Sequence, residues 1–202
     1  MPICILVRHG ETDWNRSGQV MGHQPIPLNQ AGERQVRHLA AALCHAKIAG
    51  LYSSPVLRAV QTANILGEAC HVGMTMAPGL SEIGVGEWIN RFWRELADDP
   101  AKRDWYTRPR EARPPGGETL HEVQQRAISA IEDIRTIDAD GHWVFVSHAD
   151  VIRAIVAHYL QTDMAPLCRM RIDNASATGL EITPQGNQLL FLNYRPGHSM
   201  MI

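Results

Sequence analysis

Short apolar runs alternate along this chain with longer stretches in which apolar and polar positions recur with a helical period. The apolar runs occupy residues 3–7, 48–52 and 143–146. Continuous apolar runs of this length are typical of strands that are buried on both faces of a sheet. We therefore predict three buried strands at these positions.

Helical patterns follow these runs. Asn29 is expected to cap a helix whose buried face carries Val36, Leu39, Ala40 and Leu43. Ser54 is expected to cap a second helix, with Pro55 at its first position, that continues to about residue 69. A helix is also expected over about 150–160.

A capping box predicts a further helix after residue 118. Thr119 and Glu122 have the spacing at which two side chains bind each other's backbone N–H groups. Behind them runs an apolar stripe formed by Leu120, Val123, Ala127, Ile131 and Ile134.

The remaining segments are less regular. Residues 10–27 are expected to form a long loop, and 71–118 hold many Gly and Pro residues and most of the tryptophans. Within the latter, a helix is predicted over about 88–97 and a loop over 108–117. The segment 169–194 predicts a hairpin with its turn at 184–186.

Three strand–helix alternations predict one α/β domain over residues 1–202, with three α/β/α layers around a mostly parallel sheet. A chain of this length can bury a full core without a metal or disulfide. Ligands of such folds bind at the carboxyl ends of the strands. We therefore expect the active site at that edge.

Composition narrows the candidate functions. The formal net charge is −2, so the chain lacks the excess of basic residues expected for binding nucleic acid or membrane surfaces. The four cysteines, none in a CxxC pattern, are expected to be reduced and buried: Cys4, Cys44, Cys70 and Cys168. No signal peptide or apolar run of ~18 residues is recognisable, so a cytoplasmic location is expected.

Positive and imidazole groups follow the predicted strands. Arg8 and His9 follow the first, Arg58 lies one helical turn after the second, and His148 follows the strand at 143–146. Two arginines and two histidines at one sheet edge predict an anion site, because a guanidinium matches phosphate oxygens bidentately. The histidines add a nucleophile or a proton donor.

The segment Leu6-Val7-Arg8-His9-Gly10-Glu11-Thr12-Asp13-Trp14-Asn15 resembles the signature of the histidine phosphatase (phosphoglycerate mutase-like) superfamily. Further blocks resemble that family in the same order, and five ordered blocks are more specific than one triplet. They are Pro27-Leu28 with Gly32, 52–63, Leu80-Ser81-Glu82 with Gly86 and Trp88, Gly116-Gly117-Glu118, and 146–153.

The resemblance implies a role for each matching residue. His9 would attack phosphorus and become phosphohistidine, while Arg8, Arg58, His148 and Asn15 would hold the phosphoryl oxygens. Glu82 would act as general acid and then as base, and the phosphate charge should raise its pKa. The attacking nitrogen of His9 must be unprotonated, so its other N–H is expected to donate to a carbonyl such as that of Gly10. Residues 83–118 would form a lid.

Some assignments stay open. Glu11 and Asp13 are alternatives to Glu82 as the general acid, although Glu11 is expected to pair with an arginine. Asp150 is interpreted as a charge at a helix N-terminus, at the edge of the sheet where the active site is expected. Gly22, His23 and Ala149 are candidate substrate contacts. The aromatic group of Trp88, Phe92, Trp93 and Trp105 is interpreted as core or lid wall.

The predicted activity is hydrolysis of a small phosphorylated metabolite without metal or other cofactor. Departures from the family pattern, such as Ile89-Asn90 after Trp88 and Ala149-Asp150 after His148, leave the substrate open. One alternative is a cofactor-dependent phosphoglycerate mutase, whose family members are longer. Another is an inactive protein that only binds a phosphorylated ligand. A homodimer is left open.

Overall fold

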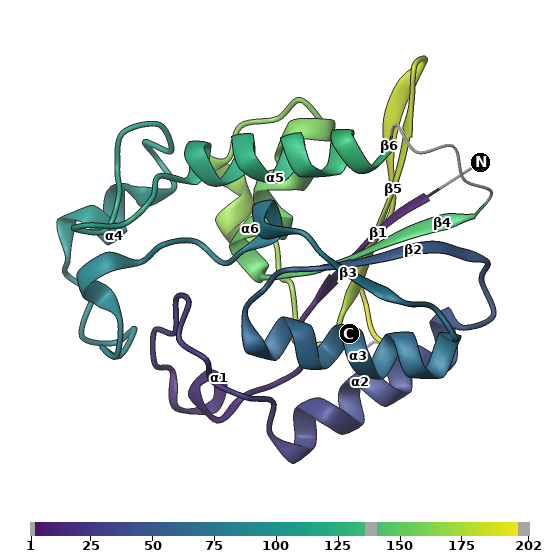
Figure 1. The fold of residues 1–202 in the computed structure, drawn as a ribbon. Helices are drawn as coiled ribbons and strands as arrows, with labels where there is room; N and C mark the ends of the chain where they lie inside the picture. The colour runs from purple at the N-terminus through teal and green to yellow at the C-terminus, as the bar shows by residue number, and fades with distance from the viewer. Residues whose placement is uncertain (1–2, 136–140, 198–202) are drawn as a thin grey trace.

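The computed structural model describes residues 3–135 and 141–197, and in this part of the chain six strands form one sheet (Figure 1). The strands are β1 (Ile3–Arg8), β2 (Ile48–Ser53), β3 (Met74–Met76), β4 (His142–Ser147), β5 (Ala177–Thr183) and β6 (Gly186–Tyr194). Their order is β3-β2-β4-β1-β5-β6. The first four strands in this order are parallel, whereas β5 and β6 pair antiparallel. The mostly parallel sheet is confirmed.

Helices cover both faces of this sheet. They are α1 (Asp13–Ser17), α2 (Gln30–Leu43), α3 (Leu57–Cys70), α4 (Pro100–Trp105), α5 (Leu120–Arg135) and α6 (Ala149–Tyr159), with short 3₁₀ turns at Pro78–Leu80, Gly86–Trp88 and Ala165–Arg169. In Figure 1, α2 and α3 lie on one side of the sheet, and α5 and α6 lie on the other. The three α/β/α layers are therefore confirmed.

Two hydrophobic cores lie between these layers. Successive residues of a strand point to opposite faces, so Cys4 and Leu6 of β1 pack in the core with α5 and α6. Ile5 and Val7 pack in the core with α2 and α3. The continuous apolar run that predicted this strand thus reflects burial on both faces.

The predicted helix caps of α2 and α5 are confirmed. Asn29 Oδ1 accepts from the Gly32 N–H at 2.8 Å at the start of α2. At α5, Thr119 Oγ1 accepts from the Glu122 N–H at 3.1 Å, and Glu122 Oε2 accepts from the Thr119 N–H at 2.8 Å. These bonds satisfy N–H groups that a helix leaves unpaired at its start.

The predicted start of α3 is wrong by two residues. The helix begins at Leu57, and Val56 is its N-cap. Ser54 Oγ accepts from the Val56 N–H at 3.2 Å but also bonds to His148 Nε2 at 2.8 Å. The serine therefore shapes the turn between β2 and α3 and links it to the residue after β4.

The helix predicted over 88–97 is also wrong. Only Gly86–Trp88 forms a 3₁₀ turn there, and turns with an isolated bridge from Phe92 to Gln19 follow. The backbone of this segment pairs with another loop, since Asn90 N donates to Val20 O at 3.0 Å and Val20 N donates to Arg91 O at 2.9 Å. These long-range bonds compete with the bonds of a helix.

Three smaller elements escaped the sequence patterns, and one prediction was too long. The loop 10–27 contains the short helix α1, and the segment 71–118 contains β3 and α4. The hairpin strands begin at Ala177 and not near residue 169, because residue 169 ends a 3₁₀ turn and 170–176 form neither helix nor strand. In Figure 1, α4 and its neighbouring turns extend from one end of the sheet, apart from the two helical layers.

The expectation of four reduced, buried cysteines is wrong for three of them. Cys44 and Cys70 form a disulfide that joins the ends of α2 and α3. Cys168 is exposed, and only Cys4 is a buried free thiol. The helix ends meet because α2 and α3 pack side by side, which spacing in the sequence does not reveal.

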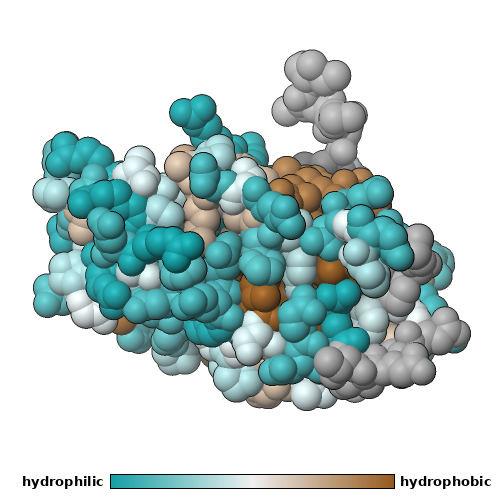
Figure 2. Space-filling model, turned by 90° about the horizontal axis from the view of Figure 1, so that it is seen from above, coloured by the Kyte–Doolittle hydropathy of each residue, from teal (hydrophilic) through white to brown (hydrophobic). Residues whose placement is uncertain are grey.

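The surface is largely polar. Seen from above in Figure 2, hydrophilic residues cover most of the face and hydrophobic residues form limited patches. Within residues 3–135 and 141–197, no helix is long and apolar enough to cross a membrane.

Candidate active site

The ends of three adjacent parallel strands bring the predicted site residues together. β1 pairs with β4 so that Arg8 lies opposite Ser147, and β2 pairs with β4 so that Ser53 lies opposite Val146. The residues that follow these positions, His9 and His148 among them, therefore meet at one edge of the sheet. Their ring centroids are 5.2 Å apart.

His9 is buried and held in one tautomer. Its Nδ1 lies 2.7 Å from the Gly10 carbonyl oxygen, which can only accept, so Nδ1 carries the hydrogen. The lone pair of the ring is then on Nε2, as the sequence analysis expected. Burial, and after it the charges of Arg58 and Arg8, hold the pKa of His9 well below its usual range. The imidazole is therefore neutral and nucleophilic.

Arg58 is fully buried and contacts four predicted site residues. Its Nε donates to His9 Nε2 at 3.1 Å, and its Nη2 lies 3.2 Å from His148 Nδ1 and 3.4 Å from Glu82 Oε2. The Gly22 carbonyl accepts from Nη2 at 2.9 Å. Arg58 thus lies at the centre of the cluster, and burial lowers its pKa from the usual value.

His148 is the second neutral imidazole. Its Nδ1 accepts from Arg58, so its other nitrogen carries the hydrogen, and Nε2 donates to Ser54 Oγ at 2.8 Å. Burial is the main cause that holds the pKa of His148 well below its usual range, and the charge of Arg58 adds to it. An anion bound nearby would favour the protonated ring and raise this pKa.

Glu82 lies beside both basic groups. Its Oε2 is 3.4 Å from Arg58 Nη2 and 3.5 Å from His148 Nδ1, and its side chain is only 16% exposed. Burial raises the pKa of Glu82, although the charge of Arg58 opposes this. A raised pKa keeps a carboxyl group protonated to a higher pH than usual, which suits a general acid.

Arg126 of α5 fixes the loop that carries Glu82. Its guanidinium donates to the carbonyl oxygens of Gly79, Ser81 and Glu82 at 2.7, 2.8 and 3.1 Å. It also donates to both carboxylate oxygens of Glu118 at 2.9 and 3.0 Å. This arrangement was not predicted, although Glu118 belongs to a block that resembles the family.

Arg8 and Asn15 line the same cavity as His9. Arg8 Nη1 donates to the Ile172 carbonyl at 2.7 Å, while its buried Nε has no hydrogen-bond partner within the described part of the chain. Burial lowers the pKa of Arg8 to about 10, so the group stays charged at neutral pH. Asn15 Oδ1 accepts from Thr12 N at 3.0 Å and from Asn174 Nδ2 at 3.2 Å.

A cavity of about 520 Å³ opens beside this cluster. Six predicted site residues line it, namely Arg8, His9, Asn15, Gly22, Glu82 and Ala149. His23 is outside this lining and instead contacts the Glu82 carbonyl through Nε2 at 2.6 Å. The rival acids Glu11 and Asp13 are also outside the lining, and both accept hydrogen bonds from Asn29 Nδ2.

The sequence analysis assigned no role to several other lining residues, which include Trp14, Lys102, Tyr106 and Arg153. Lys102 and Tyr106 belong to no recognisable motif, whereas Trp14 and Arg153 lie in segments that resemble the family but had no role of their own. Asp150 also lines the cavity, where it accepts from Tyr106 and Arg153. Glu11 lies 4.0 Å from the exposed Arg16, so the arginine near it is outside the active-site cluster.

Gly32 shows how closely the His9 loop packs on α2. A Cβ atom at this position would lie 2.1 Å from the Glu11 carbonyl oxygen. Thr62 of α3 holds the same loop, because its Oγ1 accepts from the Gly10 N–H at 3.0 Å and donates to the Arg58 carbonyl at 2.8 Å. His9 is thus positioned by contacts with two helices.

No group of three or more His, Cys, Asp or Glu side chains in the described part of the chain is arranged to hold a metal ion. The charged groups that surround His9 are two arginines and one carboxyl. This arrangement suits a phosphoryl group, since guanidinium groups stabilise its oxygens in phosphoryl transfer.

Comparisons with known proteins agree with this chemistry. Residues 4–195 match the family model of the histidine phosphatase superfamily (branch 1). Phosphoserine phosphatase 1 of Hydrogenobacter thermophilus is 30% identical over 195 residues, which cover 94% of this chain and 90% of that relative. An adenosylcobalamin/alpha-ribazole phosphatase of Salmonella typhimurium is 30% identical over 192 residues, which cover 94% and 95%.

The fold also matches solved structures. A mycobacterial glucosyl-3-phosphoglycerate phosphatase superposes with a TM-score of 0.87 at 26% sequence identity, over 96% of this chain and 99% of that one. The similarity therefore extends over the whole layered domain.

Proposed function

This chain belongs to the histidine phosphatase superfamily (branch 1), and on that basis we propose that it hydrolyses a small phosphorylated metabolite through a phosphohistidine on His9. The observation that carries the proposal is the His9 tautomer, because Nε2 presents a lone pair beside Arg58 and Glu82. Both relatives named above carry phosphatase names.

In the first step, His9 Nε2 attacks phosphorus. The P–N bond forms as the ester P–O bond breaks, and the leaving alkoxide takes the proton of Glu82. Glu82 suits this role because burial raises its pKa. Transfer through a covalent intermediate divides one difficult displacement into two easier ones.

In the second step, water replaces the alcohol. The Glu82 carboxylate takes a proton from water, the water oxygen bonds to phosphorus, and the P–N bond breaks. Orthophosphate leaves, and His9 returns to its neutral form. The same carboxyl group serves as acid and then as base because it lies beside the leaving and the entering oxygen.

Arg8 and Arg58 supply two positive charges against the two negative charges of a phosphomonoester. Asn15 donates through its NH₂ group, because its oxygen is engaged by Thr12 and Asn174. His148 holds the phosphoryl group once the anion has raised its pKa enough to protonate Nδ1. Stabilisation of this kind is the main source of catalysis in phosphoryl transfer.

The direct test is phosphate release from p-nitrophenyl phosphate, combined with trapping of an acid-labile phosphoenzyme after rapid quenching. Wild-type protein is expected to show both, and His9→Ala neither. His38→Ala, which removes an exposed histidine of α2, is the matched control. Turnover in His9→Ala that equals the wild type excludes the mechanism.

Two further assays separate the alternatives. Activity is expected to survive dialysis against a chelator, since the proposed mechanism uses no metal. Interconversion of 2- and 3-phosphoglycerate that depends on bisphosphoglycerate, without net phosphate release, would instead identify a mutase. Binding of phosphate esters without either reaction would identify an inactive ligand-binding protein.

A further inference from the structure

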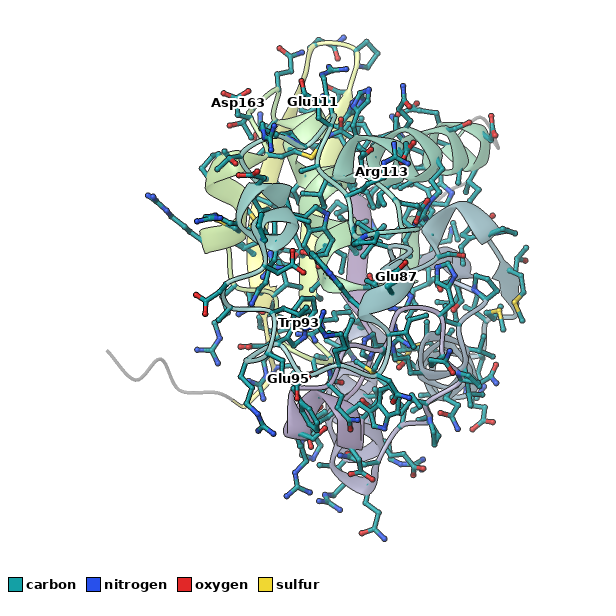
Figure 3. The ribbon with its side chains drawn as sticks, turned by 90° about the vertical axis from the view of Figure 1, so that its left-hand side faces the viewer. Glu87, Trp93, Glu95, Glu111, Arg113 and Asp163 are labelled. Carbon is teal, nitrogen blue, oxygen red and sulfur yellow. A yellow bond between two sulfur atoms is a disulfide. The ribbon has the colours of Figure 1, made fainter. Side chains whose placement is uncertain are left out.

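The cavity beside His9 has a strongly aromatic lining. Trp14, Trp93 and Trp105, three of the five tryptophans in the chain, contribute to it together with Tyr106. Figure 3 shows the face of the molecule that carries Trp93, which is labelled near the middle of the view. The volume of about 520 Å³ lies in the range of pockets that enclose ligands of drug size. A three-carbon phosphate ester would leave much of it unfilled.

The indole rings are fixed in place by packing. Trp93 stacks on Trp105 with centroids 6.4 Å apart and planes 22° apart, and Trp88 meets Trp105 edge-on at 5.5 Å. Lys102 Nζ donates to the Trp93 carbonyl at 3.0 Å and lies 5.5 Å from the centroid of its ring. A ring that is already ordered loses little freedom when it binds a flat partner.

Hydrogen-bond donors accompany these rings. Outside the group around His9, the charged residues of the lining are Lys102, Arg153 and Asp150, with a balance of one positive charge. Asp150 accepts from Tyr106 and from Arg153 Nη1, the latter at 2.9 Å, so this carboxylate is already engaged. Burial raises the pKa of Tyr106, so its hydroxyl keeps the proton that it donates to Asp150, and the charged donors left for a ligand belong to Lys102 and Arg153. The lining therefore favours ligand groups that accept hydrogen bonds.

We propose that the alcohol of the substrate carries a planar ring rich in hydrogen-bond acceptors, as a nucleoside does, and that this ring binds against Trp93. The inference rests on the proposed phosphatase activity and adds the class of leaving group. Aromatic walls bind flat rings through stacking, and the donors of Lys102 and Arg153 match ring nitrogens and oxygens. A three-carbon acid such as phosphoserine or phosphoglycerate offers no ring for this wall.

A nested series of substrates tests the proposal. Glycerol 3-phosphate, ribose 5-phosphate and adenosine 5′-monophosphate all release a primary alcohol, so the bond-breaking chemistry is nearly constant. We expect kcat/KM to be about tenfold or more higher for the nucleotide than for ribose 5-phosphate, as base stacking on an aromatic side chain typically gives. Equal values for these two esters, or a preference for phosphoserine or 3-phosphoglycerate, would overturn the proposal.

Two variants test whether the planar ring of the substrate binds against Trp93. Trp93→Leu is expected to lower the ratio of kcat/KM for the nucleotide over glycerol 3-phosphate by about tenfold. Tyr194→Leu, an exposed aromatic residue on β6, is the matched control and should keep the wild-type ratio. An unchanged ratio in a folded Trp93→Leu protein overturns the assignment.

A second variant covers the case in which Trp93→Leu does not fold. Trp14→Leu removes a lining residue of α1, and it should also lower the ratio, because Trp14 belongs to the same aromatic lining. An unchanged ratio there contradicts the proposal.

Failure of the wild-type protein to hydrolyse any ester, p-nitrophenyl phosphate included, removes the phosphatase activity and this inference with it. Turnover of all esters at equal efficiency removes only this inference.

Discussion

Glu82→Gln isolates the proton that the leaving alcohol requires. Glutamine has nearly the same size, and its single acceptor oxygen can accept either from Arg58 Nη2, which lies 3.4 Å from Oε2, or from the Ile83 N–H, which lies 3.0 Å from Oε1. The fold should therefore survive the change. The side chain loses its ability to give and take a proton, together with one of these two accepted hydrogen bonds.

The size of the effect follows from the chemistry of the leaving group. An alkoxide is a poor leaving group, and proton donation is typically worth about 10²–10⁴-fold, or about 3–5 kcal/mol of transition-state stabilisation. p-Nitrophenolate leaves without this help, so its release should slow by less than about tenfold. Glu82→Gln should therefore have a much larger effect on alkyl phosphates than on aryl phosphates.

The pH dependence of kcat provides a second test of the role of Glu82. Burial raises the pKa of Glu82, so the proton is present at low pH and is lost as the pH rises through that raised value. Wild-type kcat on an alkyl phosphate should fall on the alkaline side, and Glu82→Gln should lack that decline. The pKa of His9 is held well below its usual range, so the nucleophile is already unprotonated near neutral pH.

The assay compares kcat for glycerol 3-phosphate and p-nitrophenyl phosphate between pH 5 and 9, a window of about two units on either side of neutrality. Glu11→Gln is the control, because Glu11 is outside the cavity lining and contacts Asn29. Equal losses on both esters in Glu82→Gln, or an alkaline decline that persists, would refute the reasoning. The acid would then have to be another group.

Two other predictions follow from the packing. Arg126→Met removes three hydrogen bonds to the loop that carries Glu82 and two hydrogen bonds to the Glu118 carboxylate. We expect kcat to fall about tenfold for alkyl phosphates and less for aryl phosphates, and the unfolding free energy to fall by about 2 kcal/mol. Equal losses of kcat on both kinds of ester would contradict a positioning role for Arg126. Replacing Cys44 and Cys70 by serine should lower the unfolding free energy by about 3 kcal/mol, given their sequence separation of 26. Denaturant midpoints that coincide with and without the disulfide would contradict this.

The disulfide also bears on location. The cytoplasmic location stays a prediction. Disulfides are rare in reducing compartments, so the redox state of Cys44 and Cys70 in the cell is an informative measurement. The lid role of residues 83–118 likewise stays a prediction, although several of their side chains line the cavity.

Local patterns in the sequence determined the layered fold and the main cluster of candidate site residues. Buried strands are recognisable from continuous apolar runs, and the caps at Asn29 and Thr119 bind backbone groups three residues away. The site residues His9 and His148 directly follow such strands. Parallel strands must place these positions at one edge, so their meeting follows from strand order and the resemblance to a family.

Only the tertiary structure decided which distant residues support that cluster and shape its cavity. Arg126 binds a loop 44 residues away in sequence, and Cys44 meets Cys70 because two helices pack together. The segment 88–97 has the composition of a helix, yet its backbone bonds instead to Val20. Such contacts depend on the relative placement of whole elements, and a local pattern carries no information about that placement.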